Sequence, residues 1–139
     1  MQAEPTTETN LVRALVRATR AVTTHLEPTL RDAGLTLDQW LAIDALHQAG
    51  GLTMSELATA TAVTGPTLTR VVDRLVMTAV VFREVDAADR RKVRVYLAPR
   101  GRTTHRKLSP KLAAAERDLL AAAGAPPSLT HLLAKITTA

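Results

Sequence analysis

Small polar side chains and long cations share one short segment of the chain. In order, the segment holds Thr64, Pro66, Thr67, Thr69, Arg70 and Arg74. Threonine hydroxyls can approach the edges of bases closely, and an arginine can reach guanine or a phosphate. At the start of an exposed helix, these side chains could read the major groove of DNA. The alternative is an ordinary capped helix start that faces solvent.

A second group of cations follows two acids. Asp86 and Asp89 come just before or beside Arg90, Arg91 and Lys92. An arginine can enter the narrow minor groove of DNA, where the negative potential is enhanced. Neighbouring carboxylates can hold the loop in shape and orient the guanidinium. Two carboxylates could instead bind a metal ion, but internal ion pairing explains them better beside three cations, so we expect no metal.

The positive charge of the chain is concentrated in one stretch. Between Arg70 and Lys107 eleven bases stand against four acids, a net charge of +7, whereas the other residues carry −2 and the whole chain +5. A contiguous basic region of this kind is typical of a surface that contacts phosphates. A solvated basic face that binds no nucleic acid is the alternative.

Several classes of protein are disfavoured by composition. The chain has no cysteine, which excludes disulfides, thiol nucleophiles and cysteine-based zinc sites. It offers no nucleophile with a base, no phosphate-binding loop and no metal cluster, so we expect neither an enzyme nor a cofactor. No apolar run is long enough for a membrane helix and the first residues do not form a signal peptide, so we expect a cytoplasmic protein.

Helices must position these side chains, because apolar residues recur at spacings of three and four over most of the chain. The pattern predicts helices over 8–32, 37–48, 54–60, 64–78, 100–122 and 128–137. Thr53 with Glu56 has the spacing of a capping box, and we expect Thr64 to cap the next helix with Pro66 in its first turn. Pro110 lies inside a predicted helix and should kink or break it near Arg106.

The apolar period changes to two after the fourth helix, so 80–85 and 93–97 are predicted strands on either side of a polar loop. Two short helices followed by a hairpin form a winged helix-turn-helix. The predicted fold is therefore mainly α with a small β-hairpin wing. The wing loop carries the second group of cations, and the fourth helix carries the first.

Two segments resemble the MarR family of bacterial transcriptional regulators. The run REVDAADRRKVRVYL over 83–97, followed by Pro99, Arg100 and Gly101, is similar to the wing of that family. The run LTMSELA over 52–58 is similar to the helix before its recognition helix. One difference stands at Ala79, where family members usually have glycine in the turn into the wing.

The resemblance implies a single domain over 1–139, with 37–97 as the DNA-binding lobe. It also implies an obligate homodimer joined by helices 8–32 and 100–137. Thr67 and Arg70 would enter the major groove, and Arg90 or Arg91 the minor groove. A dimer of this kind would bind double-stranded DNA at a pseudo-palindromic operator, as a repressor that a small-molecule effector releases.

Two further hypotheses follow from the sequence. Arg20, Trp40 and His47 could line an effector pocket between the dimerisation helices and the DNA-binding lobe. The basic patch could alternatively dock an acidic protein, which would make the chain a winged-helix interaction module without specific DNA binding.

Overall fold

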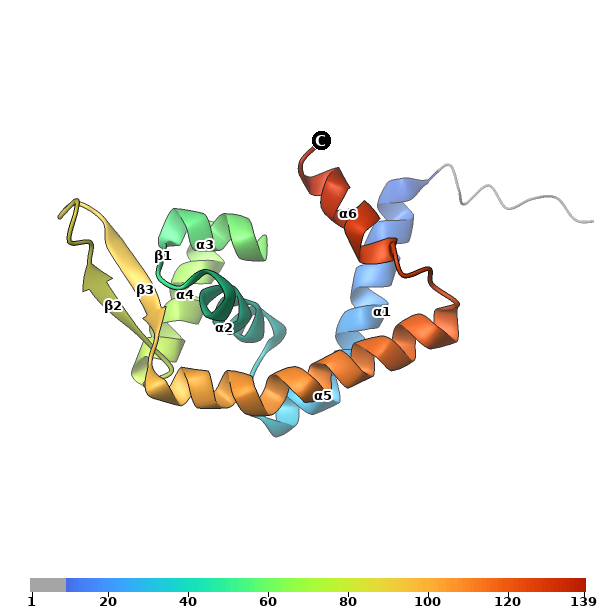
Figure 1. Cartoon of the computed structure of the whole chain (residues 1–139), viewed down its shortest axis with the longest axis horizontal. Coiled ribbons are helices and arrows are strands. Elements are labelled where there is room, and N and C mark those ends of the chain that lie inside the picture. The colour runs from blue at the N-terminus through green and yellow to red at the C-terminus, as the bar shows by residue number, and fades with distance from the viewer. Residues whose placement is uncertain (1–9) are drawn as a thin grey trace, which may run out of the picture. The chain divides into compact units, whose positions relative to one another are not determined.

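A computed structural model describes residues 10–139, which form six helices and three short strands (Figure 1). The elements are, in chain order, α1 (Leu11–Asp32), α2 (Leu37–Ala49), β1 (Leu52–Thr53), α3 (Met54–Thr61), α4 (Gly65–Met77), β2 (Val81–Val85), β3 (Val93–Leu97), α5 (Pro99–Ala123) and α6 (Leu129–Thr137). They belong to two compact units, one of residues 10–26 and 112–139 and the other of Glu27–Lys111. The mainly helical fold with a small hairpin confirms the predicted fold class.

The unit Glu27–Lys111 is built on an aliphatic core. Helices α2, α3 and α4 contact one another, α4 contacts β2, and α2 contacts β3. The largest fully buried side chains are Leu30, Ile43, Leu57, Leu68, Leu75, Val72 and Val95. Each aliphatic side chain of this size stabilises the fold by about 1.5–3 kcal/mol when fully buried. The core therefore fixes α4 and the hairpin in one unit.

The hairpin is part of a three-stranded antiparallel sheet in the order β1-β3-β2. In the hairpin of β2 and β3, called the ribbon below, Val81 pairs with Leu97 and Val85 with Val93. The strand β1 was missed by the sequence prediction because two residues are too few to show an alternating pattern. Its pairing of Leu52 with Val95 joins the wing to the residues just before α3.

The predicted helices are confirmed, with ends that differ by at most one residue where both predicted ends are described. Residues 8 and 9 of the first predicted helix lie outside the described residues. The expected break at Pro110 is wrong, because α5 continues through it from Pro99 to Ala123. Proline removes one hydrogen bond, to the carbonyl of Arg106, and the other bonds of this long helix remain to hold it together.

Ala79 occupies the turn between α4 and β2. It adopts the left-handed conformation with φ of 63°, and its N–H donates to the Val76 carbonyl at 3.0 Å. Glycine adopts this conformation without steric cost, whereas alanine does not. The turn into the wing is therefore made with alanine in a backbone conformation that favours glycine.

The other unit leaves an apolar surface exposed. On α1 the exposed side chains include Leu11, Val12 and Val16, and α6 has no buried residue at all. On α6, Leu132 and Ile136 are about half exposed. None of the helices in residues 10–139 is both long and apolar enough to cross a membrane.

Candidate nucleic-acid interface

A tight turn between α3 and α4 presents the start of α4. The helix α3 ends at Thr61, Ala62 follows in the left-handed conformation, and α4 begins at Gly65. The hydroxyl of the buried Thr61 donates to the Leu57 carbonyl at 2.8 Å and accepts from the Val63 N–H at 3.3 Å. Thr61 therefore holds the turn of the helix-turn-helix, a role that the sequence pattern did not reveal.

One face of α4 is buried and the opposite face is exposed. Leu68, Val72 and Leu75 enter the core. The predicted DNA-binding residues Thr64, Pro66, Thr69, Arg70 and Arg74 are exposed, and Thr67 is half-buried. The 3.6-residue period of the helix separates these two faces, so the structure brings the predicted residues of α4 together on one surface.

The three threonines of α4 differ in their hydrogen bonds. Thr64 takes the N-cap position but makes no side-chain cap bond, which corrects the prediction that it caps the helix. Pro66 at the second helical position has no N–H, so there is one amide fewer to cap. Thr67 accepts from Arg70 Nη2 at 3.4 Å, and Thr69 donates to the Gly65 carbonyl at 3.0 Å.

An ion pair joins α4 to the wing. Asp73 on the exposed face of α4 accepts a hydrogen bond from the guanidinium of Arg83 in β2. This contact neutralises the acid that lies between Arg70 and Arg74 in α4, on the face predicted to bind DNA. The sequence analysis did not identify Asp73 or Arg83 as a pair, because ten residues and a turn separate them.

The wing loop is closed by its own acids. The backbone N–H of Asp86 donates to the Lys92 carbonyl at 2.9 Å, and Ala88 N–H donates to Asp86 Oδ1 at 3.2 Å. Arg91 donates to Asp89 Oδ1 from its backbone at 3.1 Å and from Nε at 3.2 Å. The side-chain bond from Arg91, followed by its backbone bond, lowers the pKa of Asp89 from the ordinary 3.8. The two acids thus make contacts within the wing loop, and their role in holding its shape stays a prediction.

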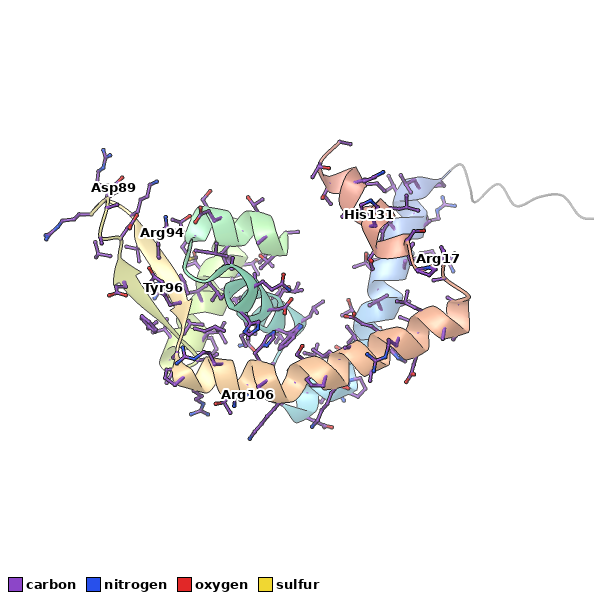
Figure 2. The ribbon with its side chains drawn as sticks, in the orientation of Figure 1. Arg17, Asp89, Arg94, Tyr96, Arg106 and His131 are labelled. Carbon is purple, nitrogen blue, oxygen red and sulfur yellow. The ribbon has the colours of Figure 1, made fainter. Side chains whose placement is uncertain are left out.

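Arg94 connects the wing to the start of α3. Its Nη1 donates to Glu56 Oε1 at 3.2 Å and to the Gly51 carbonyl at 3.3 Å, and its Nε lies 3.5 Å from Asp86 Oδ2. Figure 2 shows Asp89 at the tip of the ribbon and Arg94 further along β3, towards its base. Arg94 therefore holds β3 both to the residues at the start of α3 and to Asp86 at the start of the wing loop.

On α4 and the wing, three acids are paired with arginines, whereas several cations have no acidic partner. Asp73, Asp86 and Asp89 each contact an arginine of the protein. The cations Arg70, Arg74, Arg90 and Lys92 form no ion pair with any carboxylate in residues 10–139, and Arg91 is bonded to Asp89 with its side chain 91% exposed. Glu84 of β2 is exposed and belongs to none of the ion pairs of residues 10–139. A surface on which three acids are paired with arginines and most outer cations are unpaired attracts phosphates. The described residues contain no group of three or more side chains suited to hold a metal ion.

Part of the predicted effector pocket forms a stacked cluster. The ring of His105 stacks on Trp40 at 5.1 Å and on His47 at 3.8 Å between centroids. His105 is 7% exposed and its Nε2 lies 2.9 Å from Asp44 Oδ1. Sequence reasoning did not place His105 or Asp44 here, since 61 residues separate them. Arg20 belongs to the other compact unit, and its part in a pocket stays a prediction.

The comparisons with known proteins agree with this geometry. The model of the MarR family matches residues 33–92, which include α2 to α4, β2 and the wing loop. The curated regulator FarR of Neisseria gonorrhoeae is 30% identical over 94 residues, and the match covers 68% of this chain and 64% of FarR. The chain thus aligns with slightly less than two thirds of that relative.

Solved structures match over more of the chain. AbsC, a MarR family transcriptional regulator from Streptomyces coelicolor, is 30% identical with a TM-score of 0.78, covering 95% of this chain and 90% of AbsC. MosR of M. tuberculosis, solved in complex with DNA, is 26% identical with a TM-score of 0.77 over 92% and 93%. BpsR of Bordetella bronchiseptica, whose DNA binding is regulated by 6-hydroxynicotinic acid, is 28% identical with a TM-score of 0.78 over 90% and 96%.

Proposed function

Because the chain belongs to the MarR family of transcriptional regulators, we propose that it binds a pseudo-palindromic operator as a homodimer and represses transcription there. One observation carries the proposal: Arg70 and Arg74 on α4 and Arg90 and Lys92 on the wing are exposed and unpaired among the described residues. In this proposal α4 enters the major groove and the wing contacts the adjacent minor groove. The setting is the cytoplasm.

The exposed apolar residues of α1 and α6 support the dimer. A second copy would cover Leu11, Val12, Val16, Leu132 and Ile136, which a monomer leaves in water. A dimer would place its two α4 helices about 34 Å apart, one turn of DNA. Light scattering at micromolar concentration should give twice the chain mass, and a stable monomer would contradict the dimer.

Effector control is the second part of the proposal. The DNA binding of BpsR is regulated by 6-hydroxynicotinic acid, and we propose the same kind of control for this chain. An effector acts by binding more tightly to a dimer geometry in which the two α4 helices no longer match the groove. Arg20, Trp40 and His47 remain the residues we predict for its pocket.

The test begins with selection of bound duplexes from a random DNA pool. The selected operator and a scrambled duplex of equal length are then titrated by fluorescence anisotropy at two salt concentrations. We expect the operator to bind at least about a thousandfold more tightly. Arg70→Ala should weaken operator binding and relax base selectivity, whereas Arg106→Ala on α5 removes the same charge and should change little. Equal affinity for both duplexes would refute the regulator and favour the alternative, a module that docks an acidic protein.

A further inference from the structure

Two valines are exposed at the end of the ribbon that carries the wing loop. Val85 is 54% exposed and Val93 is 41% exposed, and they are register partners in the ribbon. Residues directly opposite each other in an antiparallel pair have their side chains close together on one face. The two side chains therefore form one apolar patch, called the valine pair below. Neither the cations predicted to bind DNA nor the polar bonds of the wing account for this patch.

The valine pair lies on the face of the ribbon that packs on the core. Side chains alternate between the two faces of a strand, so Arg83 and Val95 lie on the same face as the valine pair. Val95 is fully buried, and Arg83 bonds to Asp73 on the exposed face of α4. The valine pair thus faces the side on which α4 lies, but beyond the end of the core.

The ribbon runs back alongside α4, from the end of this helix towards its start. A tight turn follows α4, where the Val80 N–H donates to the Leu75 carbonyl at 2.9 Å. Beyond the turn, Asp73 in the second half of α4 pairs with Arg83, so the ribbon residues after Arg83 lie towards the start of α4. The valine pair and the wing loop are therefore at the same end as the predicted recognition residues of α4.

A single strand of DNA fits between these surfaces. In the proposed complex α4 lies in the major groove and the wing loop in the adjacent minor groove, so the strand that separates the two grooves passes between α4 and the ribbon. Its phosphates meet exposed cations on both sides, Arg70 on α4 and Arg90 and Lys92 on the wing loop. Its deoxyriboses present apolar C–H groups to the valine pair. The protein therefore offers cations for the phosphates and an apolar patch for the sugars of the same strand.

We propose that the valine pair packs against deoxyribose at the edge of the minor groove and makes the wing select DNA over RNA. This inference rests on the proposed function. A ribose at the same place carries a 2′-hydroxyl, which would lose its water against two valines without gaining a hydrogen bond. The contact also adds affinity by burying apolar surface, and salt does not screen this contribution as it screens a phosphate contact.

The double variant Val85→Thr with Val93→Thr tests the contact. Threonine keeps the branched shape that suits a strand and replaces one methyl group with a hydroxyl. We expect affinity for the selected operator to fall by about tenfold. The slope of log K against log salt should not change, because no phosphate contact is lost. The matched control is Val85→Ile with Val93→Ile, which keeps the patch apolar and should bind within about threefold of the wild type.

A second measurement tests the sugar itself. Ribonucleotides are substituted one at a time along each strand of the selected operator, so that each duplex differs from the DNA by one 2′-hydroxyl. In the wild type we expect at least one position at which this hydroxyl weakens binding by about fivefold or more. In the double threonine variant the same substitution should cost less than about twofold, because the threonine hydroxyls can bond to it. Backbone amide shifts of residues 81–97 report whether the ribbon is intact in each variant.

The outcomes separate the sugar contact from the proposed function. A wild type that binds the operator no better than a scrambled duplex refutes the proposed function. Where the wild type prefers the operator, three results overturn only the sugar contact. They are equal operator affinity in the threonine and isoleucine variants, a shallower salt slope in the threonine variant, and equal ribonucleotide penalties in the wild type and the threonine variant.

Discussion

Arg94 of β3 donates from Nη1 to Glu56 Oε1 at 3.2 Å, across 38 residues of sequence. The same Oε1 accepts from the backbone N–H of Thr53 at 2.9 Å. One carboxylate therefore completes the capping box of α3 and anchors the wing. The Thr53 backbone bond, and after it the Thr53 side-chain bond and the charge of Arg94, lower the pKa of Glu56. The start of the helix-turn-helix and the ribbon beside it are coupled through this group.

Arg94→Met should loosen the wing without unfolding the protein. Methionine keeps much of the apolar stem but removes the bonds to Glu56 and the Gly51 carbonyl. We expect faster amide exchange in residues 86–92 and operator binding weakened by about tenfold, because the loop must be ordered on binding. Arg100→Met is the control, since Arg100 is exposed and makes no side-chain bond in the described residues. Equal operator affinity in both variants would contradict the anchoring role.

Thr53 and Thr64 are both N-cap residues, but only Thr53 caps with its side chain. Thr53→Ala should lower the free energy of unfolding by about 1 kcal/mol, the usual cost of losing a cap. Thr64→Ala should change it by less than about 0.5 kcal/mol and instead weaken operator binding, because the exposed hydroxyl makes no bond within residues 10–139 that could be lost. Urea denaturation monitored at Trp40 measures both values. A large loss of stability in Thr64→Ala would show that its hydroxyl is structural.

These two threonines also show what the sequence could predict. Both precede an apolar run, and the local pattern located both helix starts to within one residue. Thr53 is followed three residues later by Glu56, whereas Thr64 is followed by Pro66, whose missing N–H reduces the need for a cap. Elements were predictable because periodicity and caps are local properties of the chain.

Contacts between elements were not predictable in the same way. The pairs Asp73–Arg83 and Asp44–His105 depend on how α4 packs on β2 and how α5 approaches α2. No local pattern encodes a contact across 61 residues. The exposed cations of α4 and the wing were found from the sequence because they point away from the core. The residues that restrain them were missed because their partners come from elsewhere in the chain.

Ala79→Gly should stabilise the protein. Ala79 and Ala62 have φ of 63° and 57°, a conformation that costs an L-residue with a Cβ roughly 1–2 kcal/mol. Glycine relieves this cost but adds conformational freedom to the unfolded chain, so the net gain should be about 0.5–1 kcal/mol. The midpoint temperature of thermal unfolding should rise by a few degrees in Ala79→Gly and in Ala62→Gly. The control is Ala87→Gly in the wing loop, where φ is not positive, and it should not stabilise.

Arg90→Ala with Arg91→Ala should reduce the salt dependence of operator binding. Each phosphate contact that is lost lowers the slope of log K against log salt by about 0.9 in B-DNA. We expect the double variant to bind more weakly with a slope shallower by about 1–2. The double variant Arg100→Ala with Arg106→Ala removes the same charge from exposed positions on α5 and is the control. An unchanged slope in the wing variant would place Arg90 and Arg91 outside the interface.

Asp89 should titrate below its ordinary pKa of 3.8, because the bonds from Arg91 favour its charged form. A carboxylate whose pKa is lower in the folded than in the unfolded protein stabilises the folded state. This stabilisation is complete when the pH is above the pKa of the unfolded state. The contribution is lost as the pH falls through the lowered value, so the loop should keep its shape at neutral pH and loosen only in acid.

NMR titration of the side-chain carboxyl carbon of Asp89 measures this pKa directly. Arg91→Ala should raise the pKa of Asp89 part of the way back, since the backbone N–H of residue 91 still donates, and Arg90→Ala should not change it. Equal titration of Asp89 in both variants would show that the side chain of Arg91 does not hold the wing loop.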